Sequence, residues 1–192
     1  MNHKRSWGWR WRHPAGNARK SLILIAALSE DGVIGSEQGM PWNVAKEYEQ
    51  FLRIVTGHQV LMGRRSFEEF GRDLQGCHSL VLTRGRQMVP GASRFACLED
   101  ALSAAQAKPG PLFCAGGAEV YWQTIGLASG MLLSFIKGRY SGNIFFPAII
   151  DANWRRQVVV SCEDFETVFF GRVDDILSVD VVFDVMKPAE AG

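Results

Sequence analysis

Residues 21–51 read SLILIAALSEDGVIGSEQGMPWNVAKEYEQF, and this stretch decides the fold that we expect. Its first part, Ser21–Leu28, is an almost unbroken apolar run, which is typical of a short strand buried on both faces. A loop with several glycines follows. From Asn43, a residue type that favours the N-cap position, apolar residues recur at helical spacing and predict a helix.

One carboxylate, Glu47, lies on the apolar side of this predicted helix, together with Tyr48 and Phe51. A buried acid costs free energy unless a cation or a hydrogen-bond donor meets it. We therefore predict that a ligand ring meets the Glu47 carboxylate. The opposite, solvent side of the helix is expected to carry Lys46, Glu49 and Gln50.

Short apolar runs and helical patterns alternate along the rest of the chain, which predicts an α/β domain with a mostly parallel sheet. Helices are expected over 98–107 and from about residues 67 and 117. Near the C-terminus we expect an antiparallel pair of strands at 157–160 and 177–185, whose long connection includes extra strand near 167–170. The remaining strands are expected at 59–62, 80–83, 94–97, 111–115 and 131–136.

The composition is that of an ordinary globular protein, with 47% hydrophobic and 21% charged residues among 192. No apolar run approaches the roughly 18 residues that a membrane span needs. The four cysteines form no CxxC pair, and the four histidines show no metal-binding spacing. We therefore expect no metal, no membrane span, and a cytoplasmic protein with reduced thiols.

Residues 1–20 are expected to form a basic appendage rich in Trp and Arg, separate from a single domain at 21–192. This segment holds six Lys or Arg residues and no acid, so the remaining 15 basic and 20 acidic residues leave the domain with a formal charge of −5. A body of that sign disfavours nucleic-acid binding. The segment itself is interpreted as a flexible tail, with an arm for nucleic acid, lipid or a partner subunit as the alternative.

Two glycine-led segments, residues 63–66 (Gly-Arg-Arg-Ser) and Gly116-Gly117, each follow a predicted strand and precede a predicted helix. Such junctions present free backbone N–H groups to an anion. Neither segment matches GxGxxG or a Walker loop. Together with Thr83-Arg84 they predict phosphate binding along one edge of the sheet, and Arg64 and Arg84 would select NADPH over NADH by gripping its 2′-phosphate.

Six ordered sequence features resemble dihydrofolate reductase between about Ser21 and Pro147. They are IAALSEDGVIGSEQGMPW, the acid Glu47 with Phe51, MGRRSFEEFG, VLTRG, AGGAEVYWQ and NIFFP. The resemblance implies a central, mostly parallel eight-stranded sheet with about four helices and an antiparallel C-terminal strand. It also implies that a hydride moves from NADPH to C6 of a 7,8-dihydropterin while N5 gains a proton.

By the same resemblance, Glu47 orients and polarises the pterin ring, Trp42 holds a water for the proton, and Ser134 supports the acid. Residues 35–42 would form a lid over the nicotinamide. The implied substrate-binding residues are Ile25, Ala27, Met40, Tyr48, Phe51, Phe70, Leu74, Cys77 and Ala115. The implied NADPH-binding residues are Ala27, Ile34, Gly35, Gly63, Arg64, Arg65, Ser66, Thr83, Arg84, Ala115, Gly116, Gly117, Ala118, Glu119, Val120 and Tyr121.

Cys77 departs from the family pattern, which has an arginine there that pairs with the glutamate tail of folate. A thiol cannot replace a bidentate guanidinium. Two substrates therefore stay open, 7,8-dihydrofolate and the 7,8-dihydromethanopterin of related bacterial reductases, whose extra ring methyl the small Ala115 would accommodate. A catalytically silent NADPH- or pterin-binding protein is an alternative of another class. A monomer and a homodimer are both compatible with the sequence.

Overall fold

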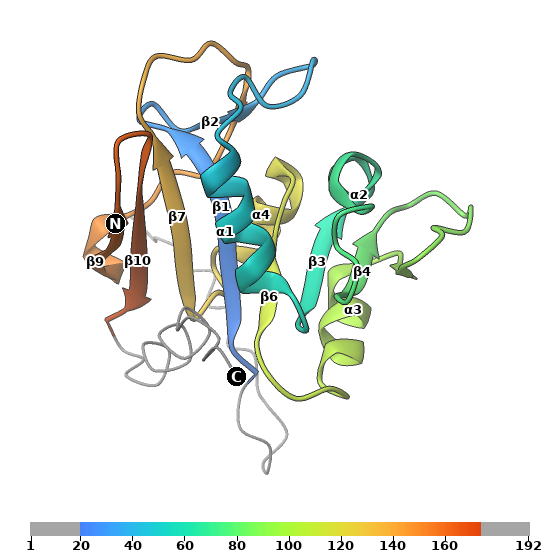
Figure 1. Ribbon diagram of the computed structural model, residues 1–192. Helices are drawn as coiled ribbons and strands as arrows, with labels where there is room; N and C mark the ends of the chain where they lie inside the picture. Colours follow the sequence, from blue (N-terminus) through green and yellow to red (C-terminus); the bar gives the residue numbers. More distant parts are fainter. Residues whose placement is uncertain (1–19, 174–192) are drawn as a thin grey trace, which may run out of the picture.

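The structure, a computed structural model, describes residues 20–173. Its centre is an eight-stranded sheet with the order β5-β4-β3-β6-β1-β7-β10-β9 (Figure 1). The strands of this sheet are β1 Leu22–Ser29, β3 Gln59–Gly63, β4 His78–Leu82, β5 Ser93–Phe95, β6 Leu112–Cys114, β7 Gly130–Ile136, β9 Trp154–Ser161 and β10 Phe165–Arg172. The helices of the described part are α1 Ala45–Val55, α2 Arg64–Phe70, α3 Leu98–Ala105, α4 Ala118–Thr124 and the short 3-10 helix η1 Asp151–Asn153.

Strand β1 lies in the middle of the sheet because its residues are apolar on both faces. Seven of its eight residues are buried, and it pairs in parallel with β6 on one side and β7 on the other. The pairs β3–β4, β3–β6 and β4–β5 are also parallel. The prediction of a mostly parallel eight-stranded sheet with four α-helices is therefore confirmed.

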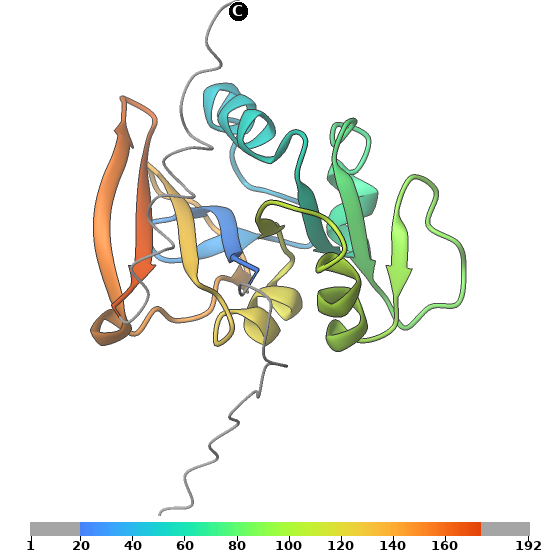
Figure 2. The same ribbon diagram turned by 90° about the horizontal axis from the view of Figure 1, so that it is seen from below.

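The helices cover both faces of the sheet, as the second view shows (Figure 2). Helices α1 and α2 pack on one face, over a core that includes Ile54, Val55 and Leu74. Helices α3 and α4 pack on the other face, where Ala101 and Tyr121 belong to a second core. Both layers leave the carboxyl ends of the parallel strands uncovered, which is where ligands bind in open α/β sheets.

The C-terminal strands differ from the prediction. The partner of β9 is β10, which occupies the centre of the expected connection and pairs antiparallel with both β9 and β7. The expected partner at 177–185 lies outside the described residues. The extra strand expected near 167–170 is confirmed by β10, which is longer, Phe165–Arg172, because pairing on both sides buries most of it.

Two details around helix α1 were also predicted wrongly. The helix is preceded by Val44 rather than by Asn43 as its N-cap, and no side chain caps it. The segment expected to start a loop forms a short strand, β2 Val33–Gly35, which pairs with β8 Ile144–Phe145. The pairing of β2 with β8 therefore holds the chain in place where the predicted lid, residues 35–42, begins.

None of the helices within residues 20–173 is long and apolar enough to cross a membrane. In the same part of the chain, no three His, Cys, Asp or Glu side chains come together as a metal site would require.

Candidate active site

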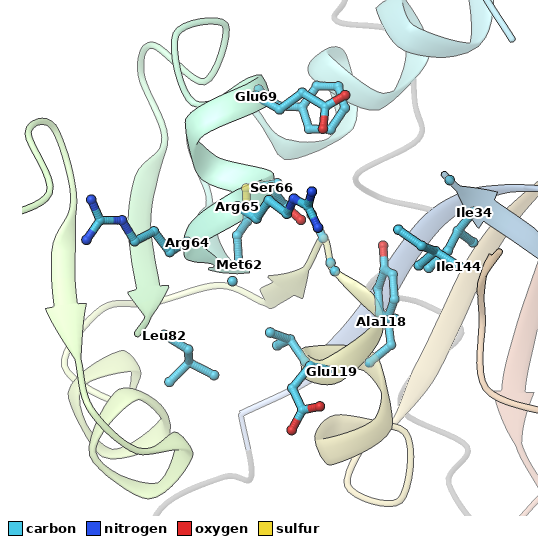
Figure 3. Close-up of a pocket in the computed structure, with 18 of the residues that line it drawn as sticks. Ile34, Met62, Arg64, Arg65, Ser66, Glu69, Leu82, Ala118, Glu119 and Ile144 are labelled. Carbon is cyan, nitrogen blue, oxygen red and sulfur yellow. The ribbon is translucent and has the colours of Figure 1, made fainter. Parts of the chain in front are cut away.

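A cleft of about 1240 Å³ opens at the carboxyl edge of the sheet, between the lid and the ends of β1, β3, β4 and β6. Figure 3 shows its walls, with Arg64, Ser66 and Leu82 on one side and Ile34 and Ile144 on the other. All sixteen residues predicted to bind the cofactor line this cleft. So do Glu47 and seven of the nine predicted substrate-binding residues, which are Ile25, Ala27, Met40, Tyr48, Phe51, Phe70 and Ala115.

Glu47 lies at the closed end of the cleft with only 6% of its surface exposed. Burial raises the pKa of this carboxyl, and a hydrogen bond from the Ser134 hydroxyl opposes the shift. Ser134 reaches this position because β7 lies directly beside β1, with Ser134 opposite Ala27. The arrangement keeps an acid in a largely buried setting beside one hydroxyl, and its carboxylate faces the cleft, where a ligand could hydrogen-bond to it.

A chain of buried hydroxyl and amide groups continues behind Ser134. The Ser134 and Thr167 hydroxyls lie 3.1 Å apart, and Gln50 Nε2 donates to Thr167 Oγ1 at 2.8 Å. Gln50 was predicted to face solvent, but it is only 7% exposed. This prediction was wrong because an amide side chain is usually exposed unless a buried partner meets it. Here that partner, Thr167, is 117 residues away in the chain.

Trp42, at the end of the predicted lid, does not line the cleft surface but packs in a core with Val33, Ile136 and Phe165. Its ring meets the Tyr140 ring edge-on at 5.2 Å, and its side chain is 8% exposed. Within residues 20–173, its Nε1 is the one buried side-chain nitrogen or oxygen without a hydrogen-bond partner. Because buried N–H groups are almost always paired, this donor is available to a water or ligand atom.

The cofactor side of the cleft is lined by glycine backbone at Gly63, Gly116 and Gly117. Gly63 N donates to Gly116 O at 2.7 Å, which joins two strand ends. A Cβ on Gly117 would lie 3.1 Å from Ser66 Oγ, and Gly116 has φ +100°, a conformation that favours glycine. Both positions therefore favour glycine, so the backbone that lines this part of the cleft carries no side chain, and these residues fit a dinucleotide.

Arginines line the same side of the cleft. Arg64 is half-buried, with its Nε 2.6 Å from Glu68 Oε1 and its NH2 3.3 Å from Gln87 Oε1. Arg65 and Arg84 are exposed. Here the cleft has the positive charge that the phosphates of a dinucleotide need.

Leu74 and Cys77 are not part of the cleft surface. Leu74 is buried beneath α1 and α2, and the half-buried Cys77 thiol donates to the Val55 carbonyl at 3.2 Å. Burial raises the pKa of this thiol, so it stays protonated. Cys77 therefore caps the end of α1 instead of facing the cleft.

Several lining residues were missed from the sequence. They include Glu69, Ile144 and residues 96–99 that follow β5. The last group could have been found, because β5 was expected and the ends of parallel strands meet at one edge. The turn 36–39, which is part of the predicted lid 35–42, also lines the cleft.

The comparisons with known proteins agree with this geometry. A family model described as dihydrofolate reductase matches residues 21–167. Dihydrofolate reductase HdrB of Haloferax volcanii is 34% identical over 72% of this chain and 77% of its own. Dihydrofolate reductase type A13 of Escherichia coli is 32% identical, over 76% of this chain and 87% of its own.

A solved structure gives the same result for the fold. It is dihydrofolate reductase from Enterococcus faecalis, complexed with NADP(H) and RAB-propyl, with a TM-score of 0.74 and 25% identity. The match covers 81% of this chain and 98% of that one. The chain belongs to the dihydrofolate reductase family, whose members are NADPH-dependent oxidoreductases.

Proposed function

We propose that this protein uses NADPH to reduce a 7,8-dihydropterin, with 7,8-dihydrofolate as the substrate and tetrahydrofolate as the product. The observation that carries the proposal is Glu47, a buried carboxylate at the closed end of a cleft whose other side is glycine backbone and arginine. A flat ring with an amidine-like edge satisfies the first feature, and an anionic dinucleotide satisfies the second.

Glu47 binds and orients the ring. In its ionised form the carboxylate accepts two parallel hydrogen bonds, from N3–H and the 2-amino group of the pterin. The negative charge makes the distant N5 more basic, which favours its protonation as C6 receives the hydride. Ser134 stabilises the ionised form, since its hydrogen bond lowers the pKa that burial raises.

Trp42 and the lid control water. The Trp42 Nε1, which has no partner, would donate to a water that relays a proton from solvent to N5 and so remains a neutral water. Ser36 and Gly39 exchange backbone hydrogen bonds at 2.8 and 3.2 Å, which forms a tight turn at the tip of the lid. Closure of this turn over the cleft excludes bulk water from the reacting atoms.

The cofactor is held by the chain at two strand ends. Residues 64–66 and 116–118 would supply backbone N–H groups, while Arg64 and Arg84 would bind the 2′-phosphate. NADPH, when bound, supplies the hydride. Tyr121 keeps this wall in place, because its hydroxyl donates to the Ile25 carbonyl at 2.6 Å and links α4 to β1.

A second candidate substrate is 7,8-dihydromethanopterin, and the observation that favours it is Cys77. The thiol is neutral and bonded to Val55, so it offers nothing to the tail carboxylate of folate. Steady-state kinetics with both dihydropterins and NADPH decide between them. An equal or higher kcat/KM on dihydrofolate excludes the methanopterin assignment.

Cys77→Arg is a companion test. If the missing guanidinium limits folate binding, the variant lowers the KM for dihydrofolate and leaves the KM for dihydromethanopterin nearly unchanged. The absence of NADPH oxidation with any dihydropterin, despite ligand binding, would instead indicate a silent binding protein.

A further inference from the structure

A buried glutamine lies one turn along helix α1 from Glu47, and the proposed reaction does not use it. Gln50 follows Glu47 by three positions, so the two side chains lie on the same side of the helix. Both are almost fully buried, with 7% and 6% of their surfaces exposed. Gln50 does not line the cleft, and its Nε2 donates instead to Thr167 Oγ1 on β10 at 2.8 Å.

The register of the sheet brings the Thr167 hydroxyl to the hydroxyl beside Glu47. Strands β7 and β10 are antiparallel, and Thr167 lies directly opposite Ser134. The two hydroxyl oxygens are 3.1 Å apart, and both side chains are buried. Since Ser134 donates to the Glu47 carboxyl, the four side chains form one continuous path that starts at the amide of Gln50 and ends at the acid.

The supply of hydrogens gives this path a single direction. The Nε2 of a glutamine can only donate, an ionised carboxylate can only accept, and each hydroxyl has one hydrogen. Ser134 uses its hydrogen on Glu47, so the hydrogen between the two hydroxyls belongs to Thr167. Thr167 in turn accepts from Gln50. Every donor in the path therefore points towards the Glu47 carboxylate.

The opposite direction suits a protonated Glu47 but conflicts with the amide. In that case Glu47 would donate to Ser134 and Ser134 would donate to Thr167. Thr167 would then accept from both sides, and its own hydrogen would have no acceptor within the path. An unpaired buried donor costs free energy, and a protonated acid that keeps the original direction accepts only a weaker, neutral hydrogen bond. The amide of Gln50 therefore favours the ionised acid.

We propose that Gln50 and Thr167 are positioning residues for Glu47, because together they hold the Ser134 hydroxyl as a donor to the carboxylate. This inference rests on the proposed function, in which the ionised form of Glu47 orients the pterin ring. Neither residue touches substrate or cofactor in this role. Their effect is to oppose the burial that raises the pKa of Glu47, so that the acid keeps its charge.

The other groups around Glu47 do not provide this effect. From helix α4 the phenol of Tyr121 interacts with the Glu47 charge, but burial above all raises the pKa of this phenol, so it stays neutral, and its hydroxyl donates to a backbone carbonyl of β1. On α1 itself, the Tyr48 hydroxyl donates to Asp73. Among residues 20–173, no lysine or arginine is a cause of the pKa shift of Glu47, which comes from burial and from Ser134.

The test measures the titration of Glu47 in the ligand-free protein by carboxyl ¹³C NMR, with Glu47→Gln to assign the signal. Gln50→Met removes the amide at nearly the same volume, and Thr167→Val removes the hydroxyl. Each is expected to move the Glu47 midpoint to higher pH by about 0.5 to 1 unit, the shift that one net hydrogen bond produces. The acidic limb of the kcat profile should move in the same direction. Thr167→Ser keeps the hydroxyl and should keep the wild-type midpoint.

Matched controls show whether the loss of any buried polar group has the same result. Gln59→Met removes another buried amide, which donates to a carbonyl of α3, and Thr124→Val removes a buried hydroxyl that bonds a carbonyl of α4. Neither should move the Glu47 midpoint. If Thr167→Val fails to fold because the Gln50 amide is left unpaired, the double variant Gln50→Met/Thr167→Val removes both partners and takes its place.

A double-variant cycle separates the path from a direct effect of Gln50, which shares a helix with Glu47. In the Ser134→Ala background the path is already broken, so Gln50→Met should add no further shift. Equal shifts in both backgrounds overturn the inference, because Gln50 would then act on Glu47 without Ser134. A lower Tm with an unchanged Glu47 midpoint indicates a structural role only and also overturns it.

The proposed function can fail separately from this inference. If the variants shift the Glu47 midpoint but the wild type oxidises no NADPH with any dihydropterin, the proposed function is wrong and the positioning of the acid is supported. If the wild type is active and the midpoint does not move in Gln50→Met and Thr167→Val, the function is supported and the inference is wrong.

Discussion

The two ends of the cleft differ in the groups that line them, which are buried polar side chains at one end and glycine backbone with arginine at the other. At the closed end, Glu47, Ser134 and Thr167 are side chains buried at 6%, 4% and 0% exposure, supplied by α1, β7 and β10. At the open end, the cleft is lined by Gly63, Gly116 and Gly117, which carry no side chains, and by the exposed Arg84. The buried hydrogen-bond network at the closed end suits a group that changes its protonation and orients a ring. The glycine backbone and cations at the open end suit an extended anion.

Because of this difference, substitutions at the two ends should change different kinetic parameters. Changes at the closed end should alter kcat and its pH dependence and leave NADPH binding intact. Changes at the open end should alter NADPH binding and leave the chemistry of the pterin intact.

The largest effect is expected for Glu47→Gln. The amide cannot carry the charge that raises the basicity of N5, so kcat at neutral pH should fall about 10²- to 10³-fold, within the range of general acid–base contributions. Single-turnover kinetics and an NADPH titration measure the two parameters, with Glu49→Gln as the matched control. Normal turnover by Glu47→Gln would remove the acid from the mechanism. A large loss of NADPH affinity would show that the two ends are not separate.

A smaller effect, about 10-fold, is expected for Arg64→Ala at the open end. The variant loses a charged hydrogen-bond donor to the 2′-phosphate, so the Kd for NADPH should rise by this factor while the Kd for NADH stays the same. Fluorescence titration with both nucleotides checks this. Arg86→Ala is the control, because Arg86 is exposed but does not line the cleft. Equal losses for NADPH and NADH would mean that Arg64 does not recognise the 2′-phosphate.

Ser134→Ala should affect the closed end by a few-fold only. The Ser134 hydrogen bond lowers the pKa of Glu47, so its loss raises that pKa further and leaves less carboxylate ionised. The acidic limb of the kcat profile should therefore move to higher pH, and kcat near pH 7 should fall about 5-fold, as for one net hydrogen bond. Ser129→Ala, at a hydroxyl that bonds the Leu22 carbonyl on the opposite edge, is the control. An unchanged pH profile would contradict the assigned role.

The smallest expected effect is on the thermal stability of Glu47→Gln relative to the wild type. Because the pKa of Glu47 is raised in the folded state, the folded protein binds more protons than the unfolded chain between the two pKa values, and its stability falls as pH rises through that window. The amide avoids this loss. The variant should therefore have a higher Tm than the wild type at pH 8, and the difference should shrink as pH falls below the unfolded pKa. A Tm difference that does not depend on pH would show that the carboxyl is not desolvated.

Most of the residues that line the cleft were named from the sequence, chiefly through the resemblance to dihydrofolate reductase. A glycine after an apolar run predicts the strand ends at Gly63 and Gly116. Helical spacing places Glu47 on the apolar face of α1. Thr167 and Gln50 were missed because their hydrogen bond joins segments that only the sheet brings together. The wrong N-cap at Asn43 has a similar cause, since the start of α1 follows the path of the lid rather than capping propensity.

Short-range order in the chain was sufficient for the class of fold and for placing Glu47 on the apolar face of a helix, because apolar runs, helical periodicity and glycines at strand ends are local patterns. The family followed from six ordered motifs in the sequence. The hydrogen-bonding surroundings of Glu47 depend on the tertiary structure. Pairing of β7 with both β1 and β10 brings Ser134 and Thr167 behind Glu47, and packing of α2 near α1 places Asp73 on Tyr48. Such contacts join residues far apart in the chain, so they arise from the packing of the sheet and its helices and leave no local pattern in the sequence.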